Sequence, residues 1–344
     1  MSPTPGKHQV ALIPLWVINL IGFCCALALS VSLVYWYSLD SIVLRQQTQA
    51  QAARKITPPQ ELSVNPFENL ALAAKAAIVY NPSVKQVVYG FNEELQLPLA
   101  SLTKLMTALV AEETVPPYMA VTILPLPKEA DVQLHVGEKW SLTDLLSYTL
   151  TTSSNSGANS IAAAVSAFLD GQETTTELTT LPHTFIEAMN QKVAQLSLMQ
   201  TYFLNSTGLD TTGEQGGAYG SAKDLALLLA EILKQHPQLL APTTQTENIF
   251  IGPDGRKIIA HNTNVIAANI PGLVGSKTGL TDLAGGNLAI VFDASFGEPF
   301  IVVVLGSSAE ERFTDIQTLV QATITYLGSA MQSSTVVDPL TLYH

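Results

Sequence analysis

Residues 98–108 read Pro-Leu-Ala-Ser-Leu-Thr-Lys-Leu-Met-Thr-Ala. The apolar spacing in and beyond this stretch predicts a buried helix from Leu102 to Glu113. Ser101 and Lys104 form the only Ser-x-x-Lys pair in the sequence, and residues three apart lie on the same face of a helix. A lysine amine beside a serine hydroxyl can take its proton if burial or a second cation lowers the lysine pKa. Taken alone, the pair is more typical of a solvated helix face.

A second polar group is Ser153-Ser154-Asn155, which lies in a Thr/Ser-rich run between two expected helices. One interpretation is an N-cap for the helix that begins near Ser156. The functional interpretation places the Ser153 hydroxyl in a proton path. It also uses the Asn155 amide to hold Lys104 and a substrate carbonyl.

A third group is Lys277-Thr278-Gly279, at the entry to a strand-like region. A second ammonium and a hydroxyl could bind a carboxylate there, and the glycine could let a substrate backbone approach closely. The alternative is a surface turn before an edge strand.

Charge and cysteine content exclude several classes of protein. The formal net charge is -12, and the 16 Lys and Arg residues are spread singly, so a nucleic-acid partner is not expected. The only cysteines are Cys24 and Cys25, which excludes a disulfide scaffold, a cysteine-ligated zinc site and a cysteine nucleophile in the rest of the chain. The six histidines show no metal-ligand spacing and are expected to be ordinary surface or core residues. We expect neither a metal nor another cofactor.

Residues 10–37 carry no charged side chain. As a helix they would span roughly 40 Å, enough to cross a bilayer, and they end in Tyr35-Trp36-Tyr37, aromatic residues suited to a membrane interface. A cleaved secretory signal is the alternative, because Ala26-Leu27-Ala28 resembles a cleavage site. Apolar residues continue past that site, which favours an uncleaved signal anchor.

The remaining pattern predicts an α+β fold. A hairpin is expected over residues 76–80 and 86–89, and two strong strands over 287–292 and 299–305. The sheet would therefore be built from both ends of the domain, with a helical insert between them. Besides the helix that starts at Leu102, helices are expected over 141–151, 156–169, 184–196, 221–234 and 310–327.

The order Ser-x-x-Lys, Ser-x-Asn, Lys-Thr-Gly resembles the signature of penicillin-recognising serine enzymes. Within that superfamily, the chain resembles the low-molecular-mass penicillin-binding proteins, the serine-type D-alanyl-D-alanine carboxypeptidases of peptidase family S11. The resemblance implies a β-lactamase/transpeptidase-like fold, an antiparallel sheet flanked by helices with an all-helical insert. Further resembling stretches are Gly137-Glu138, Met189-Asn190, 203–209, 221–226, 275–281 and Arg312-Phe313.

The resemblance implies a D,D-peptidase that forms an acyl-enzyme. Ser101 would attack the carbonyl between the two terminal D-alanines of a peptidoglycan stem peptide, with Lys104 as the base, and β-lactams would acylate the same serine. The backbone N–H groups of Ser101 and Leu280 would form the oxyanion hole.

The same resemblance assigns roles around the leaving group. Ser153 and Lys277 would relay the proton to the leaving amine, and Thr278 would bind the terminal carboxylate of the substrate. Arg312 would contribute to the electrostatic environment of that carboxylate. The alternative for Arg312 is a surface charge at the N-terminus of a helix.

The resemblance also implies a location outside the cytoplasm, at the bacterial cell membrane, because peptidoglycan lies there. Only residues 328–344 follow the last expected helix, too few for the C-terminal β-domain of many relatives, so the N-terminal span is expected to tether the enzyme. The expected organisation is a cytoplasmic N-terminus (1–9), a transmembrane signal anchor (10–37), a stalk (38–63), a penicillin-binding D,D-peptidase domain (64–328) and a C-terminal tail (329–344).

Three other functions compete with the carboxypeptidase. A class A β-lactamase would need a Glu-x-x-Leu-Asn setting, and no glutamate between Asn155 and Lys277 has one. A D,D-endopeptidase that cuts cross-links with the same machinery, and a penicillin-acylated sensor with little turnover, stay open. The chain departs from the family pattern at Ser156-Gly157 and Tyr219-Gly220, which concerns loop geometry and substrate fit.

Overall fold

The computed structural model describes residues 14–55, 65–125, 131, 133–172, 183–295 and 297–335. The chain divides into two units, Met1–Val64 and Asn65–His344. In the first unit, α1 (Leu15–Lys55) is one continuous helix. Its segment Asn19–Gln49 is apolar and long enough to cross a membrane, by length and composition. The predicted segment 1–9, together with residues 56–63 and 336–344, lies outside the described residues.

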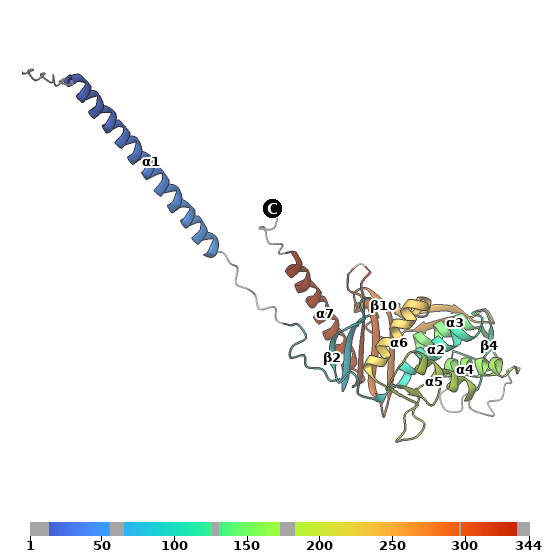
Figure 1. Cartoon of the computed structure of the whole chain (residues 1–344). Coiled ribbons are helices and arrows are strands. Elements are labelled where there is room, and N and C mark those ends of the chain that lie inside the picture. The colour runs from blue at the N-terminus through green and yellow to red at the C-terminus, as the bar shows by residue number, and fades with distance from the viewer. Residues whose placement is uncertain are drawn as a thin grey trace, which may run out of the picture. The chain divides into compact units, whose positions relative to one another are not determined.

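The second unit is built on a five-stranded antiparallel sheet with the strand order β10-β11-β12-β1-β2 (Figure 1). The strands β1 (Ala76–Asn81) and β2 (Gln86–Phe91) form the predicted hairpin. The other three come late in the chain, and β12 pairs with β1, so the two ends of the domain share one sheet as predicted. Their bounds are β10 (Leu273–Thr281), β11 (Gly285–Asp293) and β12 (Pro299–Ser307).

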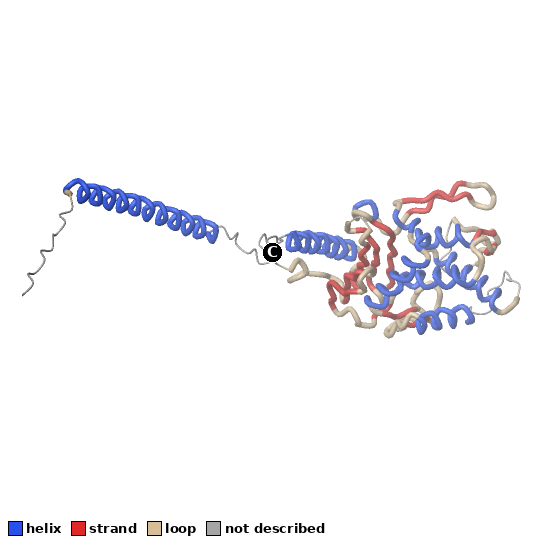
Figure 2. Tube along the Cα trace, turned by 45° about the horizontal axis from the view of Figure 1, so that its top comes forward, coloured by secondary structure: helices blue, strands red, loops and turns tan. Residues whose placement is uncertain are grey.

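Both faces of this sheet are buried. The cross-strand pair Ile78 and Val303 packs into one hydrophobic cluster, and the neighbouring pair Val79 and Val302 packs into another, because successive side chains of a strand point to opposite faces. One face is covered by α7 (Glu311–Thr335), and the other by the remaining helices of the domain (Figure 2). The sheet is therefore the central layer between two helical layers.

The helices of the insert begin and end within one residue of their predicted bounds. Two of them are fixed by serine caps: Ser141 accepts a hydrogen bond from the Asp144 N–H, and Ser221 accepts one from the Asp224 N–H. The last helix is longer than predicted and continues eight residues past Leu327, since no proline follows until Pro339. The bounds are α2 (Thr103–Thr114), α3 (Leu142–Thr152), α4 (Asn155–Leu169), α5 (His183–Gln195) and α6 (Ala222–Gln235).

Short elements that sequence analysis did not identify connect these layers. The short 3-10 helix η1 (Ala100–Leu102) precedes α2 directly. The hairpin of β8 (Glu247–Ile251) and β9 (Lys257–His261) leads back toward β10. The others are β3 (Leu97–Pro98), β4 (Ala120–Thr122), β5 (Lys139–Ser141), β6 (Tyr202–Phe203), β7 (Ala218–Gly220), η2 (Pro237–Leu239), η3 (Ala241–Thr244) and η4 (Ala267–Asn269).

Candidate active site

Ser101 and Lys104 lie side by side at the start of the α2 region. Ser101 is in η1 and Lys104 is in the first turn of α2, and the Lys104 Nζ lies 2.8 Å from the Ser101 Oγ. Lys104 is fully buried, whereas Ser101 is half-buried. The pair is therefore not a solvated helix face, and the serine hydroxyl contacts an amine that bulk water does not reach.

Two further oxygens contact the Lys104 amine. Its Nζ donates to the Asn155 Oδ1 at 2.7 Å and to the Thr207 backbone oxygen at 3.0 Å. Together with Ser101, these contacts hold the amine from three directions. The Asn155 contact was predicted from the sequence. The Thr207 contact was not, because a backbone carbonyl leaves no side-chain signal.

Both interpretations of the Ser153–Asn155 motif hold, each for different residues. Ser154 caps α4 by accepting a hydrogen bond from the Gly157 N–H at 3.0 Å, as the plain interpretation predicts. Ser153 adopts a left-handed backbone conformation, with φ of 62°, between α3 and α4. This turn places Ser153 and Asn155 on either side of the cap, where each contacts one of the two lysines.

Gly157, one of the departures from the family pattern, has a local explanation. A Cβ at this position would collide with the Thr149 Oγ1 on α3. Thr149 is buried, and its hydroxyl has no hydrogen-bond partner among the described residues. The threonine therefore fills the space that a side chain at position 157 would need.

Lys277 lies within β10, an edge strand of the sheet, and is almost fully buried. Its Nζ donates to the Ser153 Oγ and to the Thr278 backbone oxygen, both at 2.9 Å. Burial lowers the pKa of Lys277 well below its ordinary value, and the nearby charges of Lys104 and Arg312 lower it further. The neutral amine is therefore more populated near neutral pH than in a solvated lysine, so this side chain can both accept and donate a proton.

Thr278 faces a hydroxyl that sequence analysis did not identify. Its Oγ1 lies 2.6 Å from the Oγ1 of Thr263, which follows β9 by two residues. These two adjacent hydroxyls, one on the Lys277 strand and one on the segment after β9, form a donor group suited to a carboxylate. Nothing in the local pattern around Thr263 indicates this position, because it depends on the course of the β8–β9 hairpin.

Gly279 is the point where β10 approaches the Ser101 segment. A Cβ built on Gly279 would lie 2.9 Å from the Leu99 backbone oxygen and 3.2 Å from the Ser101 backbone nitrogen. Any side chain there would press against the segment that carries Ser101, so a glycine is needed for the close approach. Leu280 follows with its side chain half exposed at the sheet edge.

Arg312 is buried, and the alternative interpretation as a surface charge is therefore wrong. It lies in the first turn of α7, its Nη1 donates to the Gly279 backbone oxygen at 2.7 Å, and its guanidinium lies over the Phe313 ring at 4.8 Å. Burial lowers the pKa of Arg312 from its ordinary value. The side chain thus contacts the backbone of β10, whereas the serines and lysines contact each other.

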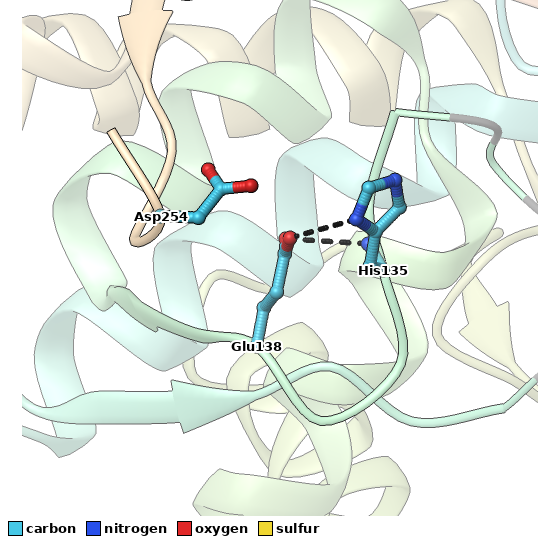
Figure 3. Close-up of side chains that lie close together, drawn as sticks. All are labelled: His135, Glu138 and Asp254. Atoms are coloured by element: carbon cyan, nitrogen blue, oxygen red, sulfur yellow. Dashed lines mark hydrogen bonds and ion pairs between the residues drawn. The ribbon is translucent and has the colours of Figure 1, made fainter. Parts of the chain in front are cut away.

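A separate cluster of possible metal ligands lies at the turn of the β8–β9 hairpin. One ligand atom each of His135, Glu138 and Asp254 lies within 4.8 Å of the others (Figure 3). The Arg256 guanidinium hydrogen-bonds both carboxylates and also donates to the Gln133 backbone oxygen at 2.6 Å. A cation therefore already occupies the carboxylate oxygens, and the cluster ties the hairpin to the 133–138 loop.

Glu138 is the centre of that link. Burial disfavours its charged form, but hydrogen bonds from Arg256, from the Trp140 indole and from the His135 backbone outweigh burial, so the pKa of Glu138 lies below its ordinary value. The carboxylate is ionised and fully engaged by protein donors. Its interactions position the hairpin that leads into Thr263.

The sequence of most of the chain matches a known family. The profile of the D-alanyl-D-alanine carboxypeptidases, peptidase family S11, matches residues 62–309. D-alanyl-D-alanine carboxypeptidase DacF of Bacillus subtilis is 29% identical over 246 residues, which make up 66% of this chain and 59% of that protein. A D-alanyl-D-alanine endopeptidase of Pseudomonas aeruginosa is 27% identical over 254 residues, or 72% of this chain and 75% of that protein.

Solved structures confirm the predicted fold class. Penicillin-binding protein D2 of Listeria monocytogenes, in its cefotaxime-bound form, has a TM-score of 0.62 and 29% identity, covering 74% of this chain and 98% of that chain. A point mutant of the Streptomyces K15 DD-transpeptidase shares the fold with a TM-score of 0.63 at 21% identity, covering 74% of this chain and 98% of that one. Because the family profile spans more than half of the sequence, the chain belongs to the D-alanyl-D-alanine carboxypeptidase family of peptidases.

Proposed function

We propose that the chain is a serine D,D-carboxypeptidase, which removes the terminal D-alanine from peptidoglycan stem peptides through an acyl-enzyme on Ser101. The observation that carries this proposal is the 2.8 Å contact between the Ser101 Oγ and the buried Lys104 amine. A serine hydroxyl becomes an effective nucleophile when an adjacent base takes its proton. The family membership supplies the substrate class.

In the acylation step, the Ser101 oxygen attacks the carbonyl carbon of the scissile peptide bond, and Lys104 takes the hydroxyl proton. The backbone N–H groups of Ser101 and Leu280 stabilise the negative oxygen that forms. The close approach of Gly279 to the Ser101 nitrogen supports this pairing, because Leu280 is the next residue along β10. The contribution of such a donor is typically about 2.7–4 kcal/mol.

The leaving D-alanine needs a proton on its nitrogen before the C–N bond breaks. Ser153 and Lys277 relay to that nitrogen the proton that Lys104 took from Ser101, and the 2.9 Å hydrogen bond between them supports this path. The lowered pKa of Lys277 suits it to proton transfer. The oxygen of a water molecule then bonds to the acyl carbon of the Ser101 ester. The bond from that carbon to the serine oxygen breaks, the shortened peptide leaves with a free carboxyl group, and a proton from the water returns to the Ser101 oxygen.

The terminal carboxylate of the substrate is bound by Thr278, assisted by the hydroxyl of Thr263 and by the positive field of Lys277 and Arg312. The 2.6 Å contact between the two threonines supports a shared role. Asn155, which contacts the Lys104 amine, orients that base and hydrogen-bonds the substrate. β-Lactams acylate Ser101 in the same site; the similar Listeria protein was solved with cefotaxime and with ampicillin.

The same site supports a D,D-endopeptidase as a second candidate. The observation that favours it is the similarity to the Pseudomonas aeruginosa protein, which is named an endopeptidase. For either activity, the apolar helix α1 anchors the enzyme in the bacterial membrane, with the peptidase domain outside the cytoplasm.

Release of D-alanine tests the proposal. The full-length protein is incubated with an excess of diacetyl-L-Lys-D-Ala-D-Ala. The amount of free D-alanine released per molecule of protein is then measured over time. We expect sustained release, its loss in Ser101→Ala, and labelling of the wild type but not of the variant by a fluorescent penicillin. Release of one equivalent or none would indicate a penicillin-acylated sensor, and cleavage of cross-linked muropeptide alone would indicate the endopeptidase.

A further inference from the structure

We propose that Asn287, on β11, is a positioning residue that holds the Ser101 segment against β10 and so sets the geometry of the oxyanion hole. The inference rests on the proposed function. Asn287 is fully buried inside the domain, and its side-chain amide hydrogen-bonds backbone groups of Pro98, Leu99 and Gly306. Its effect would act through the backbone that precedes the nucleophile.

The Asn287 amide is satisfied by backbone groups from two parts of the chain. Its Nδ2 donates to the backbone oxygens of Pro98, at 3.0 Å, and Leu99, at 3.1 Å. Its Oδ1 accepts a hydrogen bond from the Gly306 N–H at 2.8 Å, on the neighbouring strand β12. One side chain therefore joins two strands of the sheet to the segment that ends in Ser101.

The position of Asn287 opposite Gly279 makes this contact possible. The two residues are direct cross-strand partners in the antiparallel pairing of β10 with β11. Side chains of such partners project to the same face of the sheet, so the missing side chain of Gly279 leaves the room into which the Leu99–Ser101 backbone packs. Asn287 fixes the carbonyls at this point of closest approach.

The segment needs to be held because its backbone is not in a relaxed conformation. Ala100 has φ of 47°, a left-handed value that a residue with a Cβ rarely adopts. The Ala100 carbonyl accepts a hydrogen bond from the Thr103 Oγ1 at 2.8 Å and lies directly against Gly208. Strained backbone of this kind persists only where its surroundings over-determine it, and Asn287 holds the carbonyl immediately before the strained residue.

The two proposed oxyanion donors belong to different elements, Ser101 to η1 and Leu280 to β10. Their separation therefore depends on how these elements are joined. A misplacement of about 1 Å near a reacting centre can lower the rate roughly 100-fold. An oxyanion hole acts on the transition state, so its distortion lowers kcat and leaves KM nearly unchanged.

The test compares Asn287→Leu with a matched control in the full-length protein. Asn190 makes the same three kinds of hydrogen bond: its Nδ2 donates to the Ile186 and Phe203 oxygens, and its Oδ1 accepts from the Phe203 N–H. Asn190→Leu thus loses the same number of bonds away from the nucleophile. Stopped-flow acylation by a fluorescent penicillin separates the acylation rate from the affinity of the initial complex, and D-alanine release gives kcat and KM.

We expect Asn287→Leu to lower the acylation rate and kcat by about 10- to 100-fold, with KM and the initial affinity within about twofold of wild type. Asn190→Leu should lower Tm comparably and acylate at nearly the wild-type rate. If Asn287→Leu does not fold, Asn287→Ser, which keeps a hydroxyl donor without adding bulk, should show the same split with a smaller fall in rate.

Equal acylation rates in Asn287→Leu and Asn190→Leu would overturn the inference, as would a change confined to KM. In either case the proposed function stands, because the wild type still releases D-alanine. A wild type that neither labels with penicillin nor releases D-alanine would remove the proposed function, and this inference with it.

Discussion

The amine of Lys277 and the hydroxyl of Ser153 are 2.9 Å apart, although 124 positions separate the two residues in the sequence. Ser153 lies at the turn between two helices of the insert, and Lys277 lies on the edge strand of the sheet. This hydrogen bond therefore joins the helical insert to the sheet. The Lys277 amine is buried at this junction, so its ionisation affects both the stability of the domain and proton transfer in the site.

The variant Lys277→Met should be more stable than wild type at neutral pH. This gain in stability over wild type should shrink as the pH rises. Burial lowers the pKa of Lys277 in the folded state, so the unfolded chain binds more protons than the folded chain between the lowered pKa and the ordinary value near 10.5. Stability of the wild type rises with pH in that window. Lys277→Met removes the titrating group and so removes this dependence.

Thermal unfolding between pH 6 and pH 10.5 measures this effect. We expect the difference in Tm between Lys277→Met and wild type to shrink steadily over that range, with D-alanine release strongly reduced throughout. As a control, Lys257→Met replaces an exposed lysine on β9 and should give a nearly constant difference. A pH-independent gap for Lys277→Met would contradict the buried-amine interpretation.

Two adjacent serines should give opposite results when each is changed to alanine. Ser153→Ala removes the hydroxyl that contacts Lys277, so we expect kcat for D-alanine release to fall about 10²- to 10⁴-fold, the usual contribution of a positioned proton-transfer group, with little change in Tm. Ser154→Ala removes the cap of α4, which should cost about 1 kcal/mol of stability, with kcat nearly unchanged. Steady-state kinetics and thermal unfolding of both variants provide the comparison, and a large loss of kcat in Ser154→Ala alone would reverse the assignment.

Thr263→Val should weaken binding of substrates that end in a free carboxylate. The change removes one of two hydroxyls that lie 2.6 Å apart, and a hydrogen bond to a charged group contributes about 1.5–3 kcal/mol. We expect KM for diacetyl-L-Lys-D-Ala-D-Ala to rise about 10- to 150-fold, with kcat within about twofold. The same peptide with a C-terminal amide serves as the control, and an equal rise in KM for both peptides would show that Thr263 does not recognise the carboxylate.

The local pattern predicts most of the fold because helix ends are set by short-range interactions. Ser141 and Ser221 cap their helices with bonds to the N–H three residues on, and both caps are visible in the sequence. The β8–β9 hairpin was missed for a physical reason. Its outward face carries Ile249, Ile251 and Ile259, so the apolar-polar alternation that marks a half-buried strand is absent.

In the candidate site, too, the features set by local sequence could be predicted, and those that depend on the tertiary fold could not. The charged and hydroxyl side chains of the three motifs could be predicted because the motifs occur in a recognisable order. The Thr207 carbonyl on the Lys104 amine could not be, since every residue has such a group. The contacts of Asn287 and Thr263 also depend on which strands pair, and that pairing is a property of the whole domain.

Gly157→Ala should destabilise the domain, although alanine is a better helix former than glycine by about 1 kcal/mol. The new Cβ would collide with the Thr149 Oγ1, and overpacking of this kind typically costs about 1–3 kcal/mol. Thr149→Ala removes a buried hydroxyl that has no partner among the described residues, so by itself it should be nearly neutral. In the double variant the collision is gone and the helix preference of alanine remains, so the coupling free energy from a double-mutant cycle should reach at least about 1 kcal/mol. Denaturant unfolding of all four proteins measures it, and additive effects would mean that α3 and α4 separate without cost at this contact.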